Sequence, residues 1–186
     1  MDYIKYNRNA WDMKVLKGNK WTQPVSTETI KNAKEGIREI VLSPTKPVPR
    51  AWFPPLKNKS VLCLASGGGQ QGPILAATGA IVTVFDNSSN QLKQDQFAAK
   101  RDNLEIITEL GDINELSRFK DEYFDLIFHP AGGSVQDVLV VWREAYRVLK
   151  KGSNLLSGFI NPIHCIFDLK AWETGKLAVR HKIPYS

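Results

Sequence analysis

Three consecutive glycines follow an apolar run in the sequence Val61-Leu62-Cys63-Leu64-Ala65-Ser66-Gly67-Gly68-Gly69-Gln70-Gln71-Gly72. The apolar run predicts a buried strand, and Pro73 suits the first turn of a helix that begins just after the glycines. Because glycines lack a Cβ atom, the turn can adopt positive φ and let a ligand approach the backbone closely. This segment therefore predicts a strand, a tight turn and a helix, with a ligand site at the turn.

A carboxylate follows the next apolar run. Ile81–Phe85 predicts a second strand, and Asp86 comes directly after it. In a doubly wound sheet the carboxyl ends of neighbouring parallel strands share one edge, so we expect Asp86 to lie beside the glycine turn. A carboxylate there can accept hydrogen bonds from both hydroxyl groups of a ribose. The purely structural alternative is a tight turn followed by an aspartate that caps a helix.

Short apolar runs and helical patterns alternate from residue 60 onward. Strands are predicted at Val61–Ala65, Ile81–Phe85, Leu104–Thr108, Phe124–His129 and Leu155–Ile160, and helices at Pro73–Thr78, Ser89–Lys100 and Gln136–Leu149. The nearly continuous hydrophobicity of the strand segments is typical of strands that are buried on both faces. The alternation predicts an α/β fold with a doubly wound, mostly parallel sheet.

The first 55 residues differ from the rest in pattern. A helix is predicted over Thr27–Val41, with Ser26 as its N-cap. Ser43–Pro55 holds five of the ten prolines, which favours an extended connector. We therefore divide the chain into a small N-terminal helical cap with its connector, residues 1–55, and a core domain, residues 56–186.

Composition and charge exclude several classes. The 186 residues carry a net charge of +6, and residues 1–60 alone hold 12 basic and 5 acidic side chains. This excess suits a solvated basic face, and without a nucleic-acid-binding motif it does not favour a nucleic-acid partner. No apolar run approaches the roughly 20 residues of a membrane span, and residues 1–20 lack the apolar segment of a secretory signal. The only cysteines, Cys63 and Cys165, form no zinc or disulfide pattern, so we expect a cytoplasmic protein without a bound metal.

The identity of the nucleoside ligand depends on later residues. Gly67-x-Gly69-x-x-Gly72 matches the dinucleotide fingerprint, and Asp86 lies 19 positions after Gly67, so an NAD(P)-dependent oxidoreductase stays open. The chain continues with Gly111-Asp112-Ile113, then Phe124-Asp125-Leu126-Ile127, then Arg147-Val148-Leu149-Lys150 before a glycine. As an ordered set these motifs resemble the class I S-adenosylmethionine-dependent methyltransferases, in particular the bacterial subgroup with a methyltransferase type 11 domain.

The resemblance implies a Rossmann-like sheet, S-adenosylmethionine as cofactor and a set of binding residues. Ala65, Ser66, Gly67 and Gly69 would line the methionine end, Asp86 would bind the ribose with Asn87 beside the adenosine, and Asp112 and Ile113 would lie at the adenine. The N-terminal cap would close over the cofactor with Tyr6, Trp11 and Trp21. His129 would lie next to the reactive methyl group, either as a general base or in a steric or hydrogen-bonding role.

Two departures from the family pattern bear on function. The loop Ala131-Gly132-Gly133-Ser134 lacks bulky side chains, which predicts an open or mobile acceptor wall. The family sheet ends in an antiparallel hairpin, whereas only one further strand, Leu177–Ile183, can be counted here, so the C-terminal strands are expected to be missing or incomplete. A bare apolar edge at Leu155–Ile160 would invite pairing with another molecule, which leaves a homodimer and a fragile protein as alternatives.

The sequence therefore predicts a methyltransferase that acts on a small-molecule acceptor. Residues 129–132 read His-Pro-Ala-Gly, which matches neither the Asn-Pro-Pro-Tyr run of enzymes that methylate amino groups of DNA bases nor the Pro-Cys of cytosine C5 methylation. A non-catalytic module that binds a nucleoside is the main alternative, and an NAD(P)-dependent oxidoreductase is the second.

Overall fold

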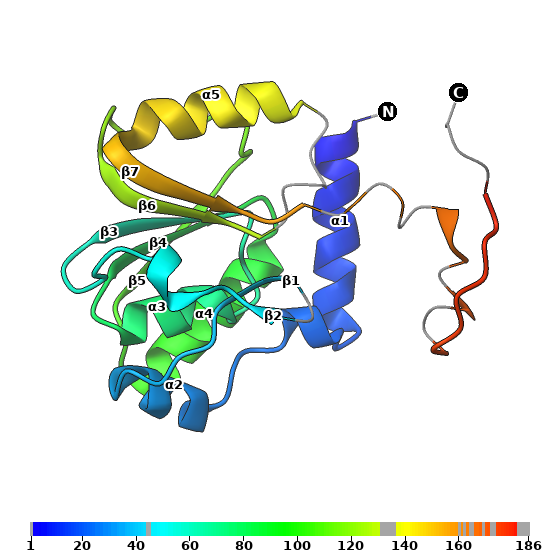
Figure 1. Cartoon of the computed structure of the whole chain (residues 1–186), viewed down its shortest axis with the longest axis horizontal. Helices are drawn as coiled ribbons and strands as arrows, with labels where there is room; N and C mark the ends of the chain where they lie inside the picture. The colour runs from blue at the N-terminus through cyan, green and yellow to red at the C-terminus, as the bar shows by residue number, and fades with distance from the viewer. Residues whose placement is uncertain are drawn as a thin grey trace.

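A five-stranded parallel sheet forms the centre of the molecule (Figure 1). The computed structural model describes residues 2–43, 46–130 and 137–159, and beyond these residues 161, 163, 166–168, 170–171 and 174–181. The strands are β3 (Ser60–Leu64), β4 (Ile81–Asp86), β5 (Ile106–Leu110), β6 (Phe124–His129) and β7 (Leu149–Ser157), in the spatial order β5-β4-β3-β6-β7. The chain thus first builds the sheet outward from β3 on one side and then returns to add β6 and β7 on the other, which is the doubly wound topology.

The register brings the ends of three neighbouring strands level with one another. Leu64, the last residue of β3, pairs with Phe85 in β4, and Asp86 at the end of β4 pairs with Leu110 in β5. The glycine turn, Asp86 and the turn after β5 therefore meet at one edge of the sheet, beside the point where the strand order reverses.

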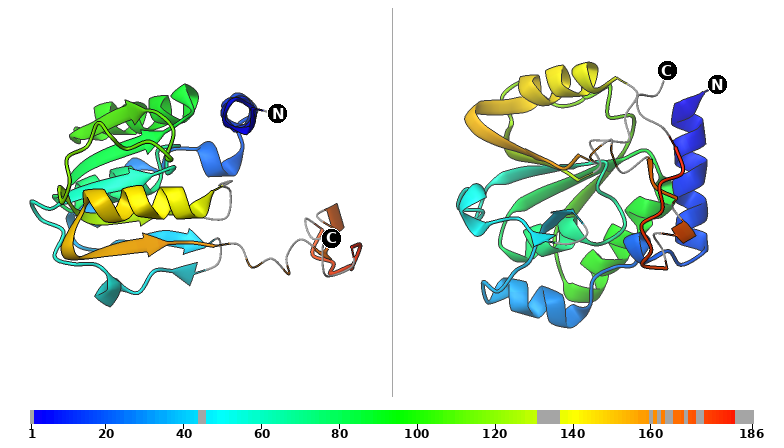
Figure 2. Two further views of the ribbon diagram at one scale, coloured as in Figure 1. Left: turned by 90° about the horizontal axis from the view of Figure 1, so that it is seen from above. Right: turned by 45° about the vertical axis from the view of Figure 1, so that its right-hand side comes forward.

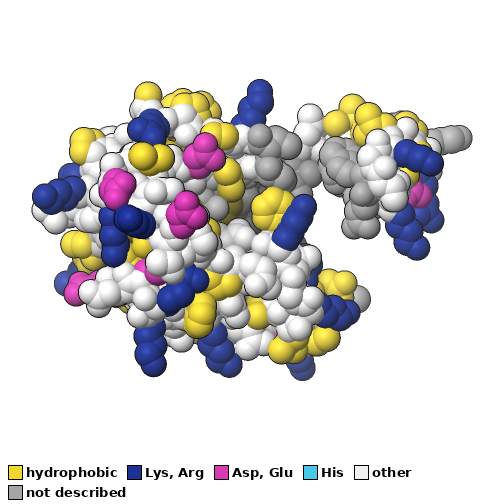
Figure 3. Space-filling view, turned by 90° about the horizontal axis from the view of Figure 1, so that it is seen from below, with side chains coloured by type: hydrophobic (Ala, Val, Ile, Leu, Met, Phe, Trp, Pro, Cys, Tyr) yellow, Lys and Arg dark blue, Asp and Glu magenta, His cyan; other side chains and the backbone are white. Residues whose placement is uncertain are grey.

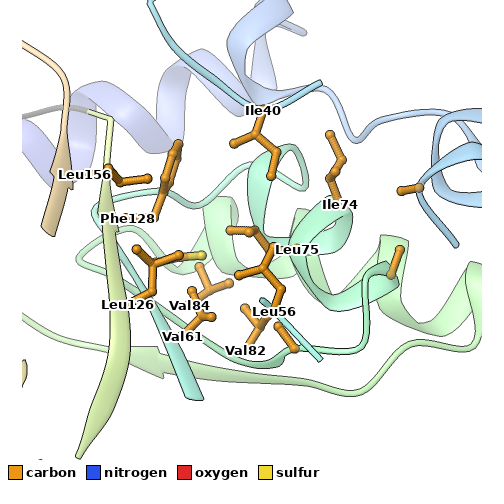
Figure 4. Close-up of a cluster of buried hydrophobic side chains, with 14 of the residues drawn as sticks. Ile40, Leu56, Val61, Ile74, Leu75, Val82, Val84, Leu126, Phe128 and Leu156 are labelled. Atoms are coloured by element: carbon orange, nitrogen blue, oxygen red, sulfur yellow. The ribbon is translucent and has the colours of Figure 1, made fainter. Parts of the chain in front are cut away.

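Helices cover both faces of the sheet. On one face lie α2 (Thr27–Lys34), α3 (Gln71–Ala77) and α4 (Ser89–Asp102), and on the other lies α5 (Val138–Val148) (Figures 1 and 2). Figure 4 shows the larger core cluster, in which the α3 residues Ile74 and Leu75 pack with Val61, Val84 and other strand residues. The α5 face has its own cluster of Leu62, Leu64, Phe85, Ile127 and Val141, among others. Both faces of β3 are buried, as its uninterrupted hydrophobicity predicts.

The five strands and three helices predicted between residues 60 and 160 are confirmed as elements, although β7 begins six residues before the predicted Leu155. Of the further strand predicted at Leu177–Ile183, the described residues show only the isolated bridge at Val179, and residues 182–183 lie outside the described residues. Two predictions in the N-terminal third are wrong. The helix predicted over Thr27–Val41 ends at Lys34, because Gly36 adopts a φ of 87° and the chain then turns into β1 (Val41–Ser43). The proline-rich segment is not a plain extended connector. It contains β2 (Lys46–Pro47), which pairs antiparallel with β1, and the short 3-10 helix η2 (Arg50–Trp52).

The N-terminal helix α1 (Tyr3–Leu16) stands across the carboxyl edge of the sheet (Figures 1 and 2). Asp2 caps it, and it has no buried residue. Arg8 Nε donates to the carbonyl oxygen of Asn87 at 2.9 Å, and Ser88 Oγ donates to Asp12 at 2.6 Å. These bonds join α1 to the loop between β4 and α4. The helix is therefore held over the edge where the glycine turn lies.

The sheet has an open edge at β7. Among the described residues after β7, the only sheet pairing is an isolated antiparallel bridge between Phe167 and Val179. The homodimer that we expect through this edge stays a prediction. Cys165 and the loop Ala131–Ser134 lie outside the described residues. None of the helices in the described part of the chain is long and apolar enough to cross a lipid bilayer.

On the face shown in Figure 3, lysine and arginine side chains are spread over the surface. Among the side chains drawn in colour there, the basic groups do not gather into one patch, and acidic side chains lie between them. This distribution is that of an ordinary solvated face.

Candidate cofactor site

A cavity of about 440 Å³ lies at the carboxyl edge of the sheet, between the strand ends and α1. Its volume is within the range of small-molecule sites in proteins. It is enclosed by α1 with η1 (Lys20–Thr22), by the strand β1, by the turns that follow β3, β4 and β5 with the first turns of α3 and α4, and by Pro130 after β6. The turns after three parallel strands thus form its floor, and the N-terminal segments form its wall.

The glycine turn presents one side to the cavity and the other to the protein. Ala65, Ser66 and Gly67 line the cavity, as predicted. Gly69 does not: its carbonyl oxygen accepts from Val25 N at 2.9 Å, and a Cβ atom at this position would lie 2.9 Å from Pro24 Cβ. Gly69, with a φ of 73°, is therefore required for packing of the turn against the N-terminal segment.

Asp86 lies at the cavity, bonded to the glycine turn. Gly67 N donates to Oδ2 at 3.0 Å, and Ser88 N donates to Oδ1 at 2.9 Å. Burial raises the pKa of Asp86, and the backbone hydrogen bonds oppose this rise. Each carboxylate oxygen has a second lone pair, so both oxygens retain the capacity to accept a hydrogen bond from a ligand. The alternative in which Asp86 serves as a helix cap does not hold, because the N-cap of α4 is Ser88.

The turn after β5 provides the next wall. Asp112, Ile113 and Asn114 line the cavity. Asp112 Oδ1 accepts from the backbone N and from Nδ2 of Asn114, at 3.1 and 2.9 Å. Asn114 Oδ1 is buried and has no hydrogen-bond partner among the described residues. A buried amide oxygen without a partner is costly, which marks this end of the cavity as a place where a polar ligand is expected.

The N-terminal helix contributes a face that the sequence analysis identified only in part. Trp11 on α1 and Trp21 on η1 line the cavity, as predicted, and Asn87 also lines it. Tyr6 does not line it and is 62% exposed. Successive residues of a helix are separated by about 100°, so Tyr3, Ile4, Asn7, Trp11 and Lys14 share one face, from which Tyr6 points away. The structure therefore gives no support to the role predicted for Tyr6, and no periodicity in the sequence had identified the inner face of the helix.

His129 is not at the cavity surface. It is 1% exposed, its Nδ1 lies 2.8 Å from the carbonyl oxygen of Leu64, and it is not among the lining residues. Burial lowers the pKa of His129, which favours the neutral ring. Its Nε2 has no hydrogen-bond partner in the described part of the chain. The structure therefore gives no support to the prediction that His129 acts at the methyl group.

Three glutamines at the cavity, Gln70, Gln71 and Gln91, were missed by the sequence analysis. Gln71 lines the cavity, and its Oε1 accepts from Val41 N at 2.9 Å, which fixes β1 as a wall. Gln91 on α4 also lines the cavity, and its Oε1 is buried without a partner among the described residues. The only available signal was position, since Gln71 lies within the glycine-rich stretch and Gln91 lies one turn beyond Ser88.

Comparison with known proteins identifies the family. A protein family described as methyltransferase domain matches residues 62–157, which span β3 through β7 and just over half of the chain. An uncharacterized methyltransferase, YbaJ of Bacillus subtilis (strain 168), is 53% identical over 184 residues, which cover 98% of this chain and 72% of that protein. The chain belongs to the methyltransferase family. The NAD(P)-dependent oxidoreductase alternative is not favoured.

Solved structures of methyltransferases have the same fold. An S-adenosylmethionine-dependent methyltransferase from Mesorhizobium loti matches with a TM-score of 0.56 at 24% identity, over 63% of this chain and 54% of that one. A putative S-adenosylmethionine-dependent methyltransferase from Methanococcus maripaludis matches with a TM-score of 0.52 at 23% identity, over 64% of this chain and 60% of that one. This methyltransferase therefore spans less than two thirds of the length of these structural relatives, with which it shares the Rossmann-like sheet.

Proposed function

We propose that this methyltransferase binds S-adenosylmethionine in the cavity and transfers its methyl group to a small-molecule acceptor. The observation that carries the proposal is the convergence of the Gly67 turn and the buried carboxylate of Asp86 on one cavity at the edge of a doubly wound sheet. Nucleoside ligands bind at this place in doubly wound folds.

The residues at the cavity fit the parts of this cofactor. Asp86 can accept from the two ribose hydroxyl groups, because each of its oxygens retains a free lone pair. Asp112 can accept from the amino group of the adenine, and the unpaired oxygen of Asn114 lies at the same end of the cavity. Ala65, Ser66 and Gly67 then remain for the methionine end, where Gln91 offers a second unpaired oxygen.

Methyl transfer requires the protein mainly to align the two reactants and to exclude water from them. S-adenosylmethionine supplies a methyl group on a cationic sulfur, which leaves as a neutral thioether when a nucleophile attacks in line. Holding the two reactants in this alignment contributes much of the rate. Trp11 and Trp21 supply apolar walls that exclude water.

The acceptor is proposed to enter on the side of β1. Val41, Leu42, Ser43 and Pro130 line the cavity away from the Asp112 end, and they carry no charge. Among the described residues that line the cavity there is no histidine, cysteine or tyrosine other than Tyr3. This lining suits an uncharged or weakly polar acceptor that is itself nucleophilic at neutral pH.

Calorimetric titration of the protein with S-adenosylmethionine, S-adenosylhomocysteine and NAD tests the proposal. We expect the first two to bind at one site per chain, in the cavity that α1 lines, and NAD not to bind. Binding of NAD alone would refute the proposal. Binding of S-adenosylmethionine with no turnover in an acceptor screen would favour the non-catalytic module instead.

A further inference from the structure

A second buried carboxyl group lies beneath the glycine turn, on the side away from the cavity. Asp95 on α4 is 0% exposed, and its Oδ2 accepts from Gly68 N at 2.9 Å. Its Oδ1 is buried without a hydrogen-bond partner among the described residues, and it would lie 3.2 Å from a Cβ atom placed on Gly72. Asp95 is thus enclosed by the turn and by the start of α3.

The groups that face Asp95 do not neutralise its charge. The negative charge of Asp86 on β4 raises the pKa of Asp95. A negative charge on Asp95 would in turn raise the pKa of the Cys63 thiol on β3. In the part of the chain that the structure describes, Asp95 takes part in no ion pair. Burial raises the pKa of Asp95 to about 8, against the opposing effect of the Gly69 and Gly68 amides. A pKa above neutrality favours the protonated, uncharged form of Asp95 at pH 7.

Asp86 and Asp95 accept hydrogen bonds from adjacent backbone amides of one turn. Gly67 N donates to Asp86 and Gly68 N donates to Asp95, so the two carboxyl groups are joined by a single residue of backbone. The proposed function places the cationic sulfur of S-adenosylmethionine between the ribose at Asp86 and the methionine end at Ala65–Gly67. A cation there is close enough to attract a charge on Asp95 through the turn, because both carboxyl groups are shielded from water. Such a cation favours ionisation of Asp95.

We propose that Asp95 is a positioning residue for the glycine turn, and that its ionisation couples binding of a cationic cofactor to release of a proton. This inference rests on the proposed function for the identity of the ligand. The positioning role rests only on the hydrogen bond from Gly68 N to Asp95, so it does not depend on the identity of the ligand. The coupling distinguishes the cationic S-adenosylmethionine from the product S-adenosylhomocysteine, which lacks the positive sulfur.

Substitution separates the positioning role from the coupling. Asp95→Asn keeps an acceptor for Gly68 N and removes the ionisation, so at pH 7 we expect its affinity for S-adenosylmethionine to stay within about threefold of that of the unaltered protein. Asp95→Ala removes the acceptor, and we expect about five- to tenfold weaker binding. Asp102→Asn changes a carboxylate at the far end of the same helix, paired with Arg101, and serves as the matched control with unchanged affinity.

Calorimetry in buffers of different ionisation enthalpy measures the coupling. The unaltered protein should release a proton on binding S-adenosylmethionine at pH 7.5, and Asp95→Asn should release less. Between pH 6.5 and 8.5 the preference for S-adenosylmethionine over S-adenosylhomocysteine should rise by about threefold or more in the unaltered protein and stay flat in Asp95→Asn. Equal proton release by both proteins would overturn the coupling.

Measurements without ligand keep the inference separate from the proposed function. The carbon-13 resonance of the Asp95 carboxyl group should titrate near pH 8, and the Gly68 amide should exchange faster in Asp95→Ala. Because folding raises the pKa of Asp95, the folded chain binds more protons than the unfolded chain between about pH 4 and 8, so stability falls as pH rises through this range. The melting temperature should therefore fall more steeply with pH in the unaltered protein than in Asp95→Asn. Titration of Asp95 near pH 4, with Gly68 exchange unchanged in Asp95→Ala, would overturn the inference whether or not the cofactor binds.

Discussion

Replacement of Asp86 by alanine is expected to weaken binding of S-adenosylmethionine by roughly ten- to a hundredfold. The change removes the carboxylate that would accept the ribose hydroxyl groups, and hydrogen bonds to a charged group contribute about 1.5–3 kcal/mol. It also removes the acceptor for Gly67 N and Ser88 N, which fixes the turn and the start of α4. Calorimetric titration with S-adenosylmethionine measures the loss.

Asp102→Ala is the control for this change. Asp102 is a buried carboxylate on α4 that is bonded to Arg101 and does not line the cavity. We expect its loss to change the melting temperature and to leave the affinity for the cofactor within about twofold. An affinity of Asp86→Ala equal to that of the unaltered protein would contradict the assignment of Asp86 to the ribose.

Replacement of Trp11 by alanine is expected to weaken cofactor binding by about ten- to thirtyfold. Trp11 lines the cavity from α1, with the Lys14 ammonium group 3.8 Å from the centre of its ring. Truncation of a tryptophan that closes over a ligand typically costs about 1.5–2 kcal/mol. Because α1 has no buried residue, the melting temperature of the ligand-free protein should change little.

Tyr6→Ala is the matched control on the same helix. Tyr6 is an aromatic residue of similar size whose side chain is mostly exposed and points away from the cavity. Its removal should leave affinity within about twofold of that of the unaltered protein. Equal losses in Trp11→Ala and Tyr6→Ala would show that α1 does not close over the cofactor in the way that the structure indicates.

The core of the fold was predictable because its sequence signals are local. Val61–Leu64 is uniformly apolar and is followed by glycines, so a buried strand and a tight turn are the natural interpretation. Asp86 could be placed beside that turn because parallel strands end at a common edge, and the pairing of Leu64 with Phe85 confirms this.

The N-terminal third was harder to predict because long-range contacts determine its structure. The helix at Thr27 ends early because Gly36 adopts a positive φ and Val41 finds a strand partner at Pro47. Neither the pairing nor the turn is visible in helical periodicity. The inner face of α1 could not be predicted either, because this face is set by the cavity that the helix covers and carries no hydrophobic stripe.

At the site, the structure differs from the sequence predictions in the direction that individual residues face. His129 ends β6 as expected, yet its ring turns toward the Leu64 carbonyl and is buried. Gly69 lies in the turn as expected, yet it faces Pro24 and Val25 instead of the cavity. Nothing in the sequence indicated that Asp95 is buried, because a polar residue in an amphipathic helix is normally exposed. Its burial results from the glycine turn, which packs over it.

A crystal structure of the protein with S-adenosylhomocysteine is the most direct measurement. We predict that both ribose hydroxyl groups lie within hydrogen-bonding distance of the Asp86 carboxylate, with the adenine at Asp112 and the amino-acid end over Ala65–Gly67. A nucleoside bound elsewhere, or a ribose that contacts neither Asp86 oxygen, would contradict the account.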